Sequence, residues 1–140
     1  MNSKNKFRFW NNMAHRYQPS DKYAIDGNGD LVAYDYETGG YDDPIPFDKS
    51  IIVAEQYTGL KDRNDKEIFE NDYLIHDDGT LYRIEFDDEH GRYIFWLQKD
   101  GDYDTCNDCL ELSTENMEIV GNLFEGPDEE KIENIEFDIY

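Results

Sequence analysis

Apolar and polar residues alternate along much of this 140-residue chain, and a repeat of two residues is typical of half-buried strands. In residues 81–86 the alternation puts three large apolar side chains on one face and two charged side chains on the other. A second run at 92–97 follows the loop 87–91, which ends in glycine as longer hairpin loops often do. These two runs predict an antiparallel pair of strands.

A third run, residues 73–76, precedes this pair across a short polar segment. The segment contains Asp78 and Gly79, a pair that favours a type I′ turn because both central residues of that turn need a positive φ. The sequence therefore predicts a three-stranded meander over residues 73–97.

Further strands are predicted where β-branched and aromatic residues gather between turn-forming residues. These are residues 31–34, 51–57 and 117–120, and an N-terminal strand in which Phe7 and Phe9 alternate with Arg8 and Trp10. Residues 37–48 contain both glycine and proline and are predicted to form a loop.

The segment from Pro127 onward has the features of a helix start. Proline is favoured at the first helical position, and the acids at 128–130 suit the first turn. Beyond it, helical spacing relates Ile132, Ile135 and Ile139, whereas strand spacing relates Ile135, Phe137 and Ile139. Residues 131–140 therefore fit a helix or a strand.

Taken together, these segments predict a mainly β fold, with α+β as the fallback. The expected architecture is a small antiparallel barrel-like sheet with the meander at its centre and a short helix after Pro127. One domain is expected over residues 1–140, because a chain of this length can bury a core of its own. Within it we distinguish a basic arm or strand (1–22), an acidic β-rich body (23–126) and a C-terminal helix or tail (127–140).

Charge is divided unevenly between the arm and the rest of the chain. Residues 1–22 hold five basic side chains and one acidic side chain, whereas residues 23–140 hold eight basic and 33 acidic side chains. The net charge of −21 and a mean hydropathy of −0.91 resemble those of disordered chains, but 15% aromatic residues in periodic runs indicate a folded protein.

Three stretches of the sequence resemble the YopX family, small proteins encoded by bacteriophages and prophages. The longest runs from Gln56 to Leu74, and the flanking ones are Lys6–Trp10 and Ile119–Glu125. The resemblance implies a phage origin and a homo-oligomer, but it implies no particular reaction. The signature residues, as we call them below, are Phe7, Arg8, Trp10, Tyr57, Gly59, Asn64, Asp72, Gly121 and Asn122.

Two departures from the family pattern concern turns. The chain has Asn64-Asp65 where relatives commonly have Asn-Gly, and Glu70-Asn71-Asp72 where they commonly have Glu-Gly-Asp. Because Asn and Asp tolerate the left-handed conformation best among non-glycine residues, we expect a turn at both places. A tight turn at 70–72 leading into the meander is also reminiscent of SH3-like small barrels.

Two acidic segments have the spacing of EF-hand ligands at positions 1, 3, 5 and 12. The glycine needed at position 6 is replaced by Leu31 in the first and by Thr105 in the second. We therefore interpret both as solvated hairpin turns and expect no metal or other cofactor. The weak metal candidates are Asp26, Asn28, Asp30 and Glu37, and then Asp100, Asp102, Asp104 and Glu111.

Other catalytic or metal-binding signals are weak. Cys106 and Cys109 form a single CxxC, which lacks the second ligand pair that a zinc site needs. The three histidines are far apart in sequence, and no phosphate-binding or nucleophile motif is present. We assign no catalytic residue and favour a non-enzymatic protein.

The acidic body makes direct nucleic-acid binding unfavourable, because phosphate recognition depends on basic side chains. No apolar run approaches the roughly 20 residues of a membrane span, and the N-terminus lacks a signal-peptide pattern, so a cytoplasmic location is expected. The preferred function is a self-assembling protein-interaction module. The alternatives are an acidic inhibitor that mimics nucleic acid and binds a basic host protein, a calcium-binding module, and a carboxylate-based hydrolase.

The aromatic residues of the arm are expected to pack on the acidic body, either that of the same chain or that of a neighbouring copy. Burial should supply most of the energy, whereas Lys6 and Arg8 should contribute only the roughly 0–1 kcal/mol typical of exposed ion pairs. We therefore expect Trp10→Ala to destabilise the protein more than Lys6→Ala and Arg8→Ala combined. The alternative is an arm that stacks on single-stranded nucleic acid.

Overall fold

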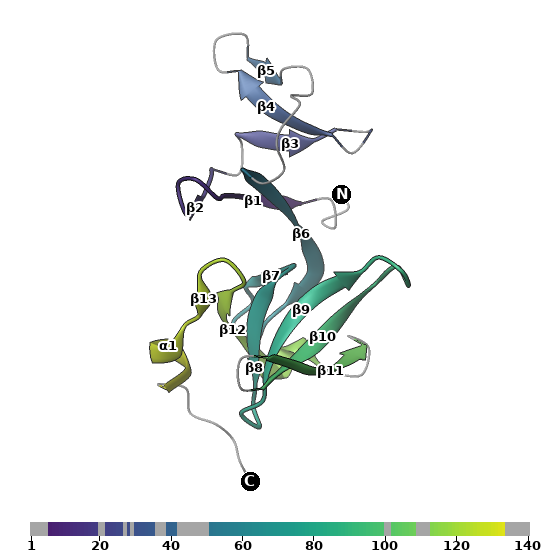
Figure 1. The fold of residues 1–140 in the computed structure, drawn as a ribbon, viewed down its shortest axis with the longest axis vertical. Helices are drawn as coiled ribbons and strands as arrows, with labels where there is room; N and C mark the ends of the chain where they lie inside the picture. Colours follow the sequence, from purple (N-terminus) through teal and green to yellow (C-terminus); the bar gives the residue numbers. More distant parts are fainter. Residues whose placement is uncertain are drawn as a thin grey trace. The chain divides into compact units, whose positions relative to one another are not determined.

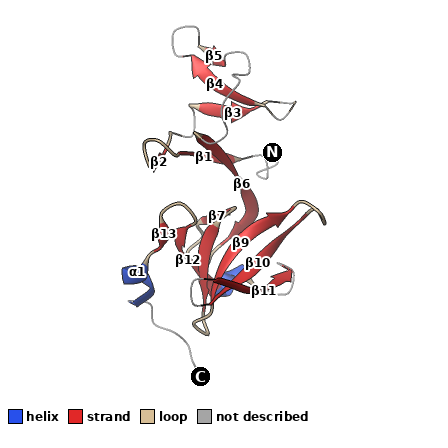
Figure 2. Cartoon of the chain, in the orientation of Figure 1, coloured by secondary structure: helices blue, strands red, loops and turns tan. Residues whose placement is uncertain are grey.

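A computed structural model gives the fold and describes residues 6–19, 22–26, 28, 30–35, 39–41, 51–99, 102–108 and 113–133. Strands account for most of the described chain, together with one short α-helix (Figures 1 and 2), which confirms the mainly β prediction. The chain divides into two compact units, residues 1–56 and 57–140. Strand β6 (Ile52–Lys61) runs from the first unit into the second.

The N-terminal unit consists of two small antiparallel arrangements of strands. In one, β1 (Phe7–Asn11) pairs with β2 (Arg16–Tyr17) on one side and with the first half of β6 on the other. In the other, β4 (Leu31–Asp35) pairs with both β3 (Tyr23–Ile25) and β5 (Gly40–Tyr41). The predicted strands at 7–10 and 31–34 are confirmed, and Gly40–Tyr41 forms a short strand inside the predicted loop 37–48.

A small aromatic and aliphatic core holds this unit together. Its buried members are Phe9, Tyr23 and Ile52, and the rings of Phe9 and Tyr23 lie 5.6 Å apart. Trp10, on the opposite face of β1, is only 3% exposed. The N-terminal arm thus packs on the body of its own chain through a paired strand with buried aromatic side chains.

The C-terminal unit contains a curled antiparallel sheet in the order β11-β10-β9-β8-β12-β13. The predicted meander is confirmed, because β8, β9 and β10 are sequential neighbours. Strand β7 pairs with the second half of β6, with a register irregularity between Tyr57 and Lys61. The bounds are β7 (Glu67–Phe69), β8 (Asp72–His76), β9 (Leu81–Asp87), β10 (Arg92–Lys99), β11 (Asp102–Asp108), β12 (Met117–Asn122) and β13 (Gly126–Pro127).

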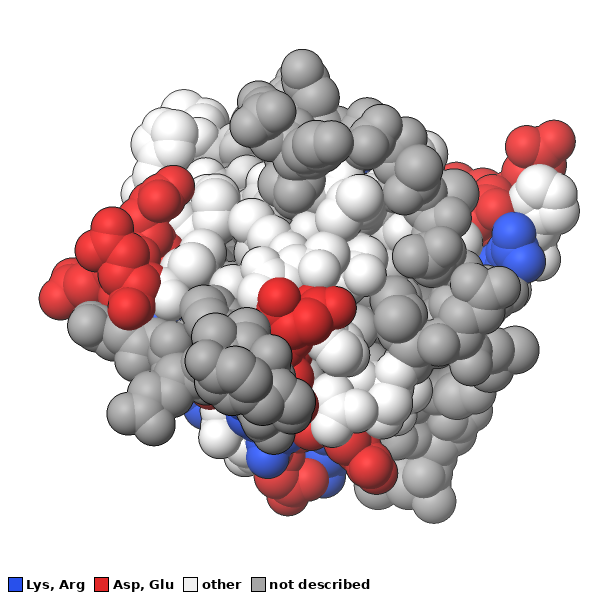
Figure 3. Space-filling model, turned by 90° about the horizontal axis from the view of Figure 1, so that it is seen from below, with Lys and Arg blue, Asp and Glu red and all other residues white. Residues whose placement is uncertain are grey.

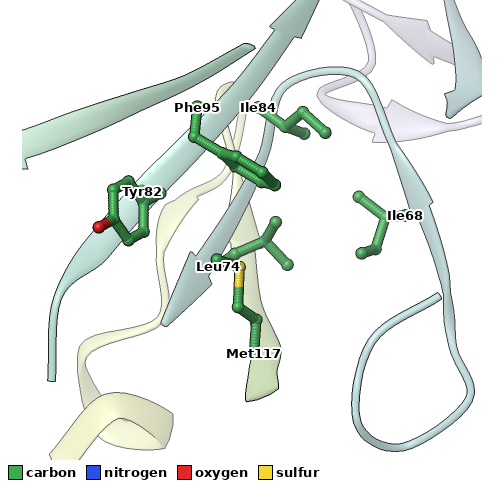
Figure 4. Packing of buried hydrophobic residues seen from close by; sticks show 6 residues of the cluster. All are labelled: Ile68, Leu74, Tyr82, Ile84, Phe95 and Met117. Carbon is green, nitrogen blue, oxygen red and sulfur yellow. The ribbon is translucent and has the colours of Figure 1, made fainter. Parts of the chain in front are cut away.

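The two faces of this sheet bury separate groups of apolar side chains. Figure 4 shows the larger group, in which side chains from β7, β8, β9, β10 and β12 point toward one another. On the other face, Tyr73, Ile75 and Val120 pack with Ile132 of the helix α1 (Glu129–Glu133). The members of the larger group are Ile68, Leu74, Tyr82, Ile84, Phe95 and Met117.

The turn between β8 and β9 differs from the type I′ prediction. Gly79 has a φ of 89°, but Asp78 has no positive φ. The amide of Gly79 donates to the carbonyl oxygen of His76, and the amide of His76 donates to that of Thr80. The loop therefore has three residues, a turn followed by a left-handed glycine, which needs only one positive φ.

The start of the C-terminal helix also lies later than predicted. Pro127 belongs to β13, and the Oδ1 atom of Asp128 accepts a hydrogen bond from the amide of Lys131. Asp128 is thus the N-cap, because a short polar side chain satisfies a free amide of the first turn better than proline does. The short helix after Pro127 is confirmed over 129–133. The choice between helix and strand for residues 134–140 falls outside the described residues.

Gly121 of the signature lies where β12 approaches β13. Its φ is 130°, and a Cβ added there would collide with the carbonyl oxygen of Gly126 and lie 3.0 Å from the Cα of Pro127. Both neighbours are backbone and cannot rotate away.

Gly121→Ala is expected to lower the free energy of unfolding by about 2 kcal/mol or more, since it combines a forbidden φ with a backbone clash. Chemical denaturation would measure this loss. Gly91→Ala is the matched control, because Gly91 also has a positive φ, 64°, but open space around its Cα. Equal losses in the two variants would show that the approach of β13 is not the cause.

Among the described residues, no helix is long and apolar enough to cross a membrane.

Candidate functional site

The first group of signature contacts forms at the turn between β6 and β7. Asp62 is only 5% exposed, and its Oδ1 atom accepts hydrogen bonds from the amides of Asn64 and Lys66 at 2.9 and 3.0 Å. Its Oδ2 atom accepts from the amide of Ile119 on β12 at 3.0 Å. One buried carboxylate therefore shapes the turn and ties it to a strand 57 residues further along the chain.

The two departures from the family pattern fall where the backbone is left-handed. Asp65 has a φ of 63° and Asn71 has a φ of 69°. Each stands where relatives commonly have glycine, so the expectation of a turn at both places is confirmed. In the second turn Oδ2 of buried Asp72 accepts a hydrogen bond from the amide of Phe69 at 2.9 Å.

The remaining signature residues of this unit also support turns and packing. Oδ1 of Asn122 accepts hydrogen bonds from the amides of Phe124 and Glu125, both at 3.0 Å. Tyr57 is 3% exposed and packs against the ring of Phe69 at 5.6 Å, and Gly59 has a φ of 85°. Exposed Asn64 donates from Nδ2 to Oε1 of Glu118 at 3.0 Å.

The second group of contacts lies in the N-terminal unit, around a buried carboxylate that no signature pattern indicated. The side chain of Glu55 is 1% exposed, and its Oε1 accepts hydrogen bonds from Nε of Arg8 and from the hydroxyl of Tyr17, both at 2.8 Å. The guanidinium of Arg8 lies 4.8 Å from the centre of the Tyr17 ring. The Tyr17 ring in turn meets Trp10 edge to face at 5.0 Å.

This geometry corrects the expectation that Arg8 forms an exposed ion pair. Arg8 is directly opposite Glu55 in the register of β1 and β6, so both side chains lie on the same face. The arginine side chain is 22% exposed, but its partner is desolvated. The contribution of Arg8 must therefore be judged as that of a partly buried pair, where loss of one charge leaves the other unbalanced.

The first acidic segment with EF-hand spacing is closed by hydrogen bonds to its own first residue, Asp26. Oδ1 of Asp26 accepts from the amides of Asn28 and Asp30, both at 2.9 Å. Asn28 and Asp30 are exposed between β3 and β4, as expected for a hairpin turn, and Glu37 lies outside the described residues.

Calcium at millimolar concentration is therefore expected to change the melting temperature no more than sodium chloride of equal ionic strength. The reason is that an EF-hand loop needs a glycine at its sixth position, and this loop has Leu31 there. Thermal unfolding in the two salts checks it, and saturable micromolar binding by calorimetry would contradict it.

The second acidic segment with EF-hand spacing does not form the predicted hairpin turn in its described part. Asp102 and Asp104 lie in strand β11, not in a loop, while Asp100 and Glu111 lie outside the described residues. Cys106 also belongs to β11, opposite Trp96 of β10, and Cys109 is not described. Pairing with β10 explains the difference, because sheet partners override the turn preference of aspartate.

One further group of possible metal ligands among the described residues lies at the turn between β9 and β10. The sequence analysis did not recognise these residues as a group. Ligand atoms of Asp87, Glu89 and His90 lie within 4.8 Å of one another. Nδ1 of His90 is 2.7 Å from Oδ2 of Asp87, and this hydrogen bond holds the pKa of Asp87 below its ordinary value. In the sequence, the spacing Asp-x-Glu-His within a predicted hairpin loop was the signal that could have revealed this group. His90 is exposed, so the group resembles an ordinary solvated turn.

The other two histidines lie apart from this group in the chain. His76 ends β8, and its Nδ1 accepts a hydrogen bond from the amide of Asp78 at 3.2 Å. The same turn holds the pKa of Asp78 below its ordinary value, chiefly through hydrogen bonding with Thr80. His15 has a φ of 53° in the turn between β1 and β2, and its ring lies 6.4 Å from that of Trp10.

Comparison with known proteins decides the lineage. The family model described as YopX protein matches residues 6–129. The chain belongs to the YopX family. YopX signature residues thus fall at the turns, strand ties and buried aromatic positions described above.

A solved structure with a similar fold supports the architecture. The crystal structure of protein EF1440 from Enterococcus faecalis is 25% identical, with a TM-score of 0.52, over 84% of this chain and 91% of that one. No curated protein matches the sequence.

Buried polar side chains, both inside and outside the YopX signature stretches, support the fold of this chain. The buried carboxylates of the described residues, Glu55, Asp62 and Asp72, each accept hydrogen bonds that join a strand to a turn or to another strand. Buried Arg83 likewise donates from NH1 to Oδ1 of Asn71 at 2.9 Å. These polar groups are used to specify the fold.

Proposed function

We propose that this YopX protein is a phage-encoded, non-enzymatic protein-interaction module that assembles with copies of itself in the cytoplasm of the host cell. The observation behind the proposal is the internal use of the buried carboxylates. A general acid or base must reach a substrate proton, whereas Asp62 holds three backbone amides and Glu55 holds Arg8 and Tyr17.

Self-assembly is supported by the size of the N-terminal unit. Its main apolar cluster has three buried members, Phe9, Tyr23 and Ile52, among the described residues. Domains of about 60 residues bury too little surface to be more than marginally stable alone. A further contact surface would add stability, and the homo-oligomer that the family resemblance implies would provide one.

Light scattering and sedimentation velocity over a wide concentration range test the proposal. We expect a defined mass larger than that of one 16.6 kDa chain. A monomer at high micromolar concentration would refute self-assembly.

A second candidate is an acidic inhibitor that occupies the nucleic-acid groove of a basic host protein. It is favoured by the net charge of −21 and by exposed acids such as Asp88, Glu89, Glu129 and Glu130. Figure 3 shows acidic side chains in several groups on one face, with few basic ones among the described residues. Pull-down from host lysate, eluted with rising salt, should recover a nucleic-acid-binding protein if this candidate is correct.

The net charge also predicts a salt effect on stability. The melting temperature is expected to rise between low and moderate salt, because repulsion among 34 acidic side chains opposes the compact state and salt screens it. Thermal unfolding in sodium chloride measures the effect. A flat or falling curve would mean that local ion pairs outweigh the net repulsion.

A further inference from the structure

The turn between β1 and β2 displays the most exposed large apolar side chain of the described residues (Figure 1). Met13 is 76% exposed, and Ala14, His15 and Arg16 beside it are exposed as well. Oδ1 of Asn11 accepts hydrogen bonds from the amides of Met13 and Ala14, both at 2.9 Å, and so shapes the turn. The backbone thus presents an unburied methionine, a residue that adaptable binding surfaces often use.

Basic residues predominate in the segment around this turn. Arg16 and Lys6 are exposed, and Lys22 is partly buried. Residues 6–19 and 22–25, all of them described, contain no acidic side chain. The β1–β2 turn therefore suits a partner surface on which an apolar side chain lies among carboxylates.

The turn between β12 and β13 has this complementary character. Leu123 is 42% exposed and is the second exposed large apolar side chain of the described chain. Glu125 and Asp128, which follow it closely, are exposed too. The amide of Leu123 donates to the carbonyl oxygen of Asn71 at 2.8 Å, and the side chain of Asn122 accepts from the next two amides, so this turn is also well ordered.

The distribution of charge favours a second copy as the partner. Residues 1–22 hold five basic side chains and one acidic side chain, whereas residues 23–140 hold eight basic and 33 acidic side chains. Acidic surfaces of two copies would repel each other, but an acidic surface of one copy attracts the basic segment of another. Each copy supplies both surfaces at the same concentration.

We propose that the β1–β2 turn of one copy docks on the β12–β13 turn of a second copy. Met13 would pack against Leu123, and Arg16 would pair with carboxylates such as that of Glu125. This inference rests on the proposed self-assembly and names the two surfaces that form the contact.

The contact joins two different surfaces, so every copy carries one of each kind. Head-to-tail contacts of this type build closed rings or open chains of copies. A single contact between two turns is small and falls in the class of weak interfaces, which bury less than about 1,200 Å². In a closed ring every copy makes two such contacts, and the last of them forms within the assembly instead of between free chains.

Two double variants of the full-length protein test the two surfaces separately. Met13→Ser with Arg16→Ser should raise the dissociation constant for assembly at least about tenfold, and so should Leu123→Ser with Glu125→Gln. Sedimentation velocity over a wide concentration range measures both. If either double variant assembles as the parent protein does, its turn is not part of the contact and the proposal is wrong.

The matched control changes one basic and one acidic side chain elsewhere in the chain. Lys66 and Glu89 are both exposed, and Lys66→Ser with Glu89→Gln should change the dissociation constant by less than about twofold. A loss equal to that of the other double variants would mean that general charge, and not the two turns, controls assembly.

An equal mixture of the first two double variants gives the decisive result. In the mixture, the intact β1–β2 turn of one variant can dock on the intact β12–β13 turn of the other, so a complex of one chain of each should form. Such a complex also shows that both variants are folded. Failure to form it, while the parent protein assembles, would overturn the proposal.

The mass of the parent protein distinguishes failure of this inference from failure of the proposed function. An oligomer that neither double variant weakens would refute the contact between the turns and leave self-assembly intact. A parent protein that stays monomeric would refute self-assembly itself, and this inference with it.

Discussion

Replacing Arg8 by alanine is expected to lower the free energy of unfolding by about 3 kcal/mol, within the range observed when one partner of a buried ion pair is removed. The side chain of Glu55 is 1% exposed and accepts hydrogen bonds from Arg8 and Tyr17. Without Arg8, this buried carboxylate would lose the guanidinium whose Nε lies 2.8 Å from its Oε1. Urea unfolding monitored by tryptophan fluorescence measures the loss.

Two comparisons isolate the pair. Arg16→Ala removes an exposed arginine from the neighbouring strand and should cost no more than about 0.5 kcal/mol. Adding Glu55→Gln to Arg8→Ala should restore part of the stability, because the unbalanced charge disappears while Tyr17 keeps an acceptor. If Arg8→Ala resembles Arg16→Ala, or if the second substitution only adds to the loss, the pair is not the cause.

This expectation replaces the ranking drawn from the sequence pattern. Trp10→Ala should still cost about 3–5 kcal/mol, since the indole is 3% exposed and contacts Tyr17. However, the loss expected for Arg8→Ala now approaches that range instead of the roughly 0–1 kcal/mol of an exposed pair. The combined loss of unfolding free energy from Lys6→Ala and Arg8→Ala is therefore no longer expected to be small compared with the loss from Trp10→Ala.

Asp62→Ala is expected to cost about 3 kcal/mol as well. Three backbone amides, those of Asn64, Lys66 and Ile119, would lose a charged acceptor in a site that is only 5% exposed. Hydrogen bonds to charged groups contribute about 1.5–3 kcal/mol each, and neighbouring ones are not additive. Chemical denaturation again measures the loss.

The neighbouring Asp65 supplies the control. Its side chain is 84% exposed and its φ is 63°, a conformation that asparagine adopts as readily. Asp65→Asn should therefore change stability by less than about 0.5 kcal/mol. Amide exchange at Ile119 adds a local measure, because Asp62→Ala should speed it. An unchanged exchange rate would contradict the role of Asp62 in tying the turn to β12.

Local sequence pattern was sufficient for the meander and for the left-handed turns. Alternation over 81–86 and 92–97 predicted strands that the structure extends by only one or two residues, to Asp87 and Lys99. Asp65 and Asn71 could be placed in turns because few residues other than glycine tolerate a positive φ. Both features depend on neighbours within a few residues in the sequence.

The features that sequence pattern missed depend on strand partners that the residues of the segment itself do not reveal. Glu55 lies in a strand-like run and has no local mark of burial, and its partner Arg8 is 47 residues away. Residues 102–108 contain turn-forming aspartates, yet they become a strand because β10 lies alongside. In each case a tertiary neighbour determined the outcome, which a single sequence does not display.

The 47-residue separation between Arg8 and Glu55 has a consequence for the time course of folding. Strands β8, β9 and β10 are joined by short turns and can pair without closing a long loop. Pairing of β1 with β6 must bring distant parts of the chain together. The entropy cost of closing this loop arises before the contacts that offset it have formed. We therefore expect the meander to form early and the N-terminal strand to dock late, so that the aromatic residues of the arm stay exposed longest during folding.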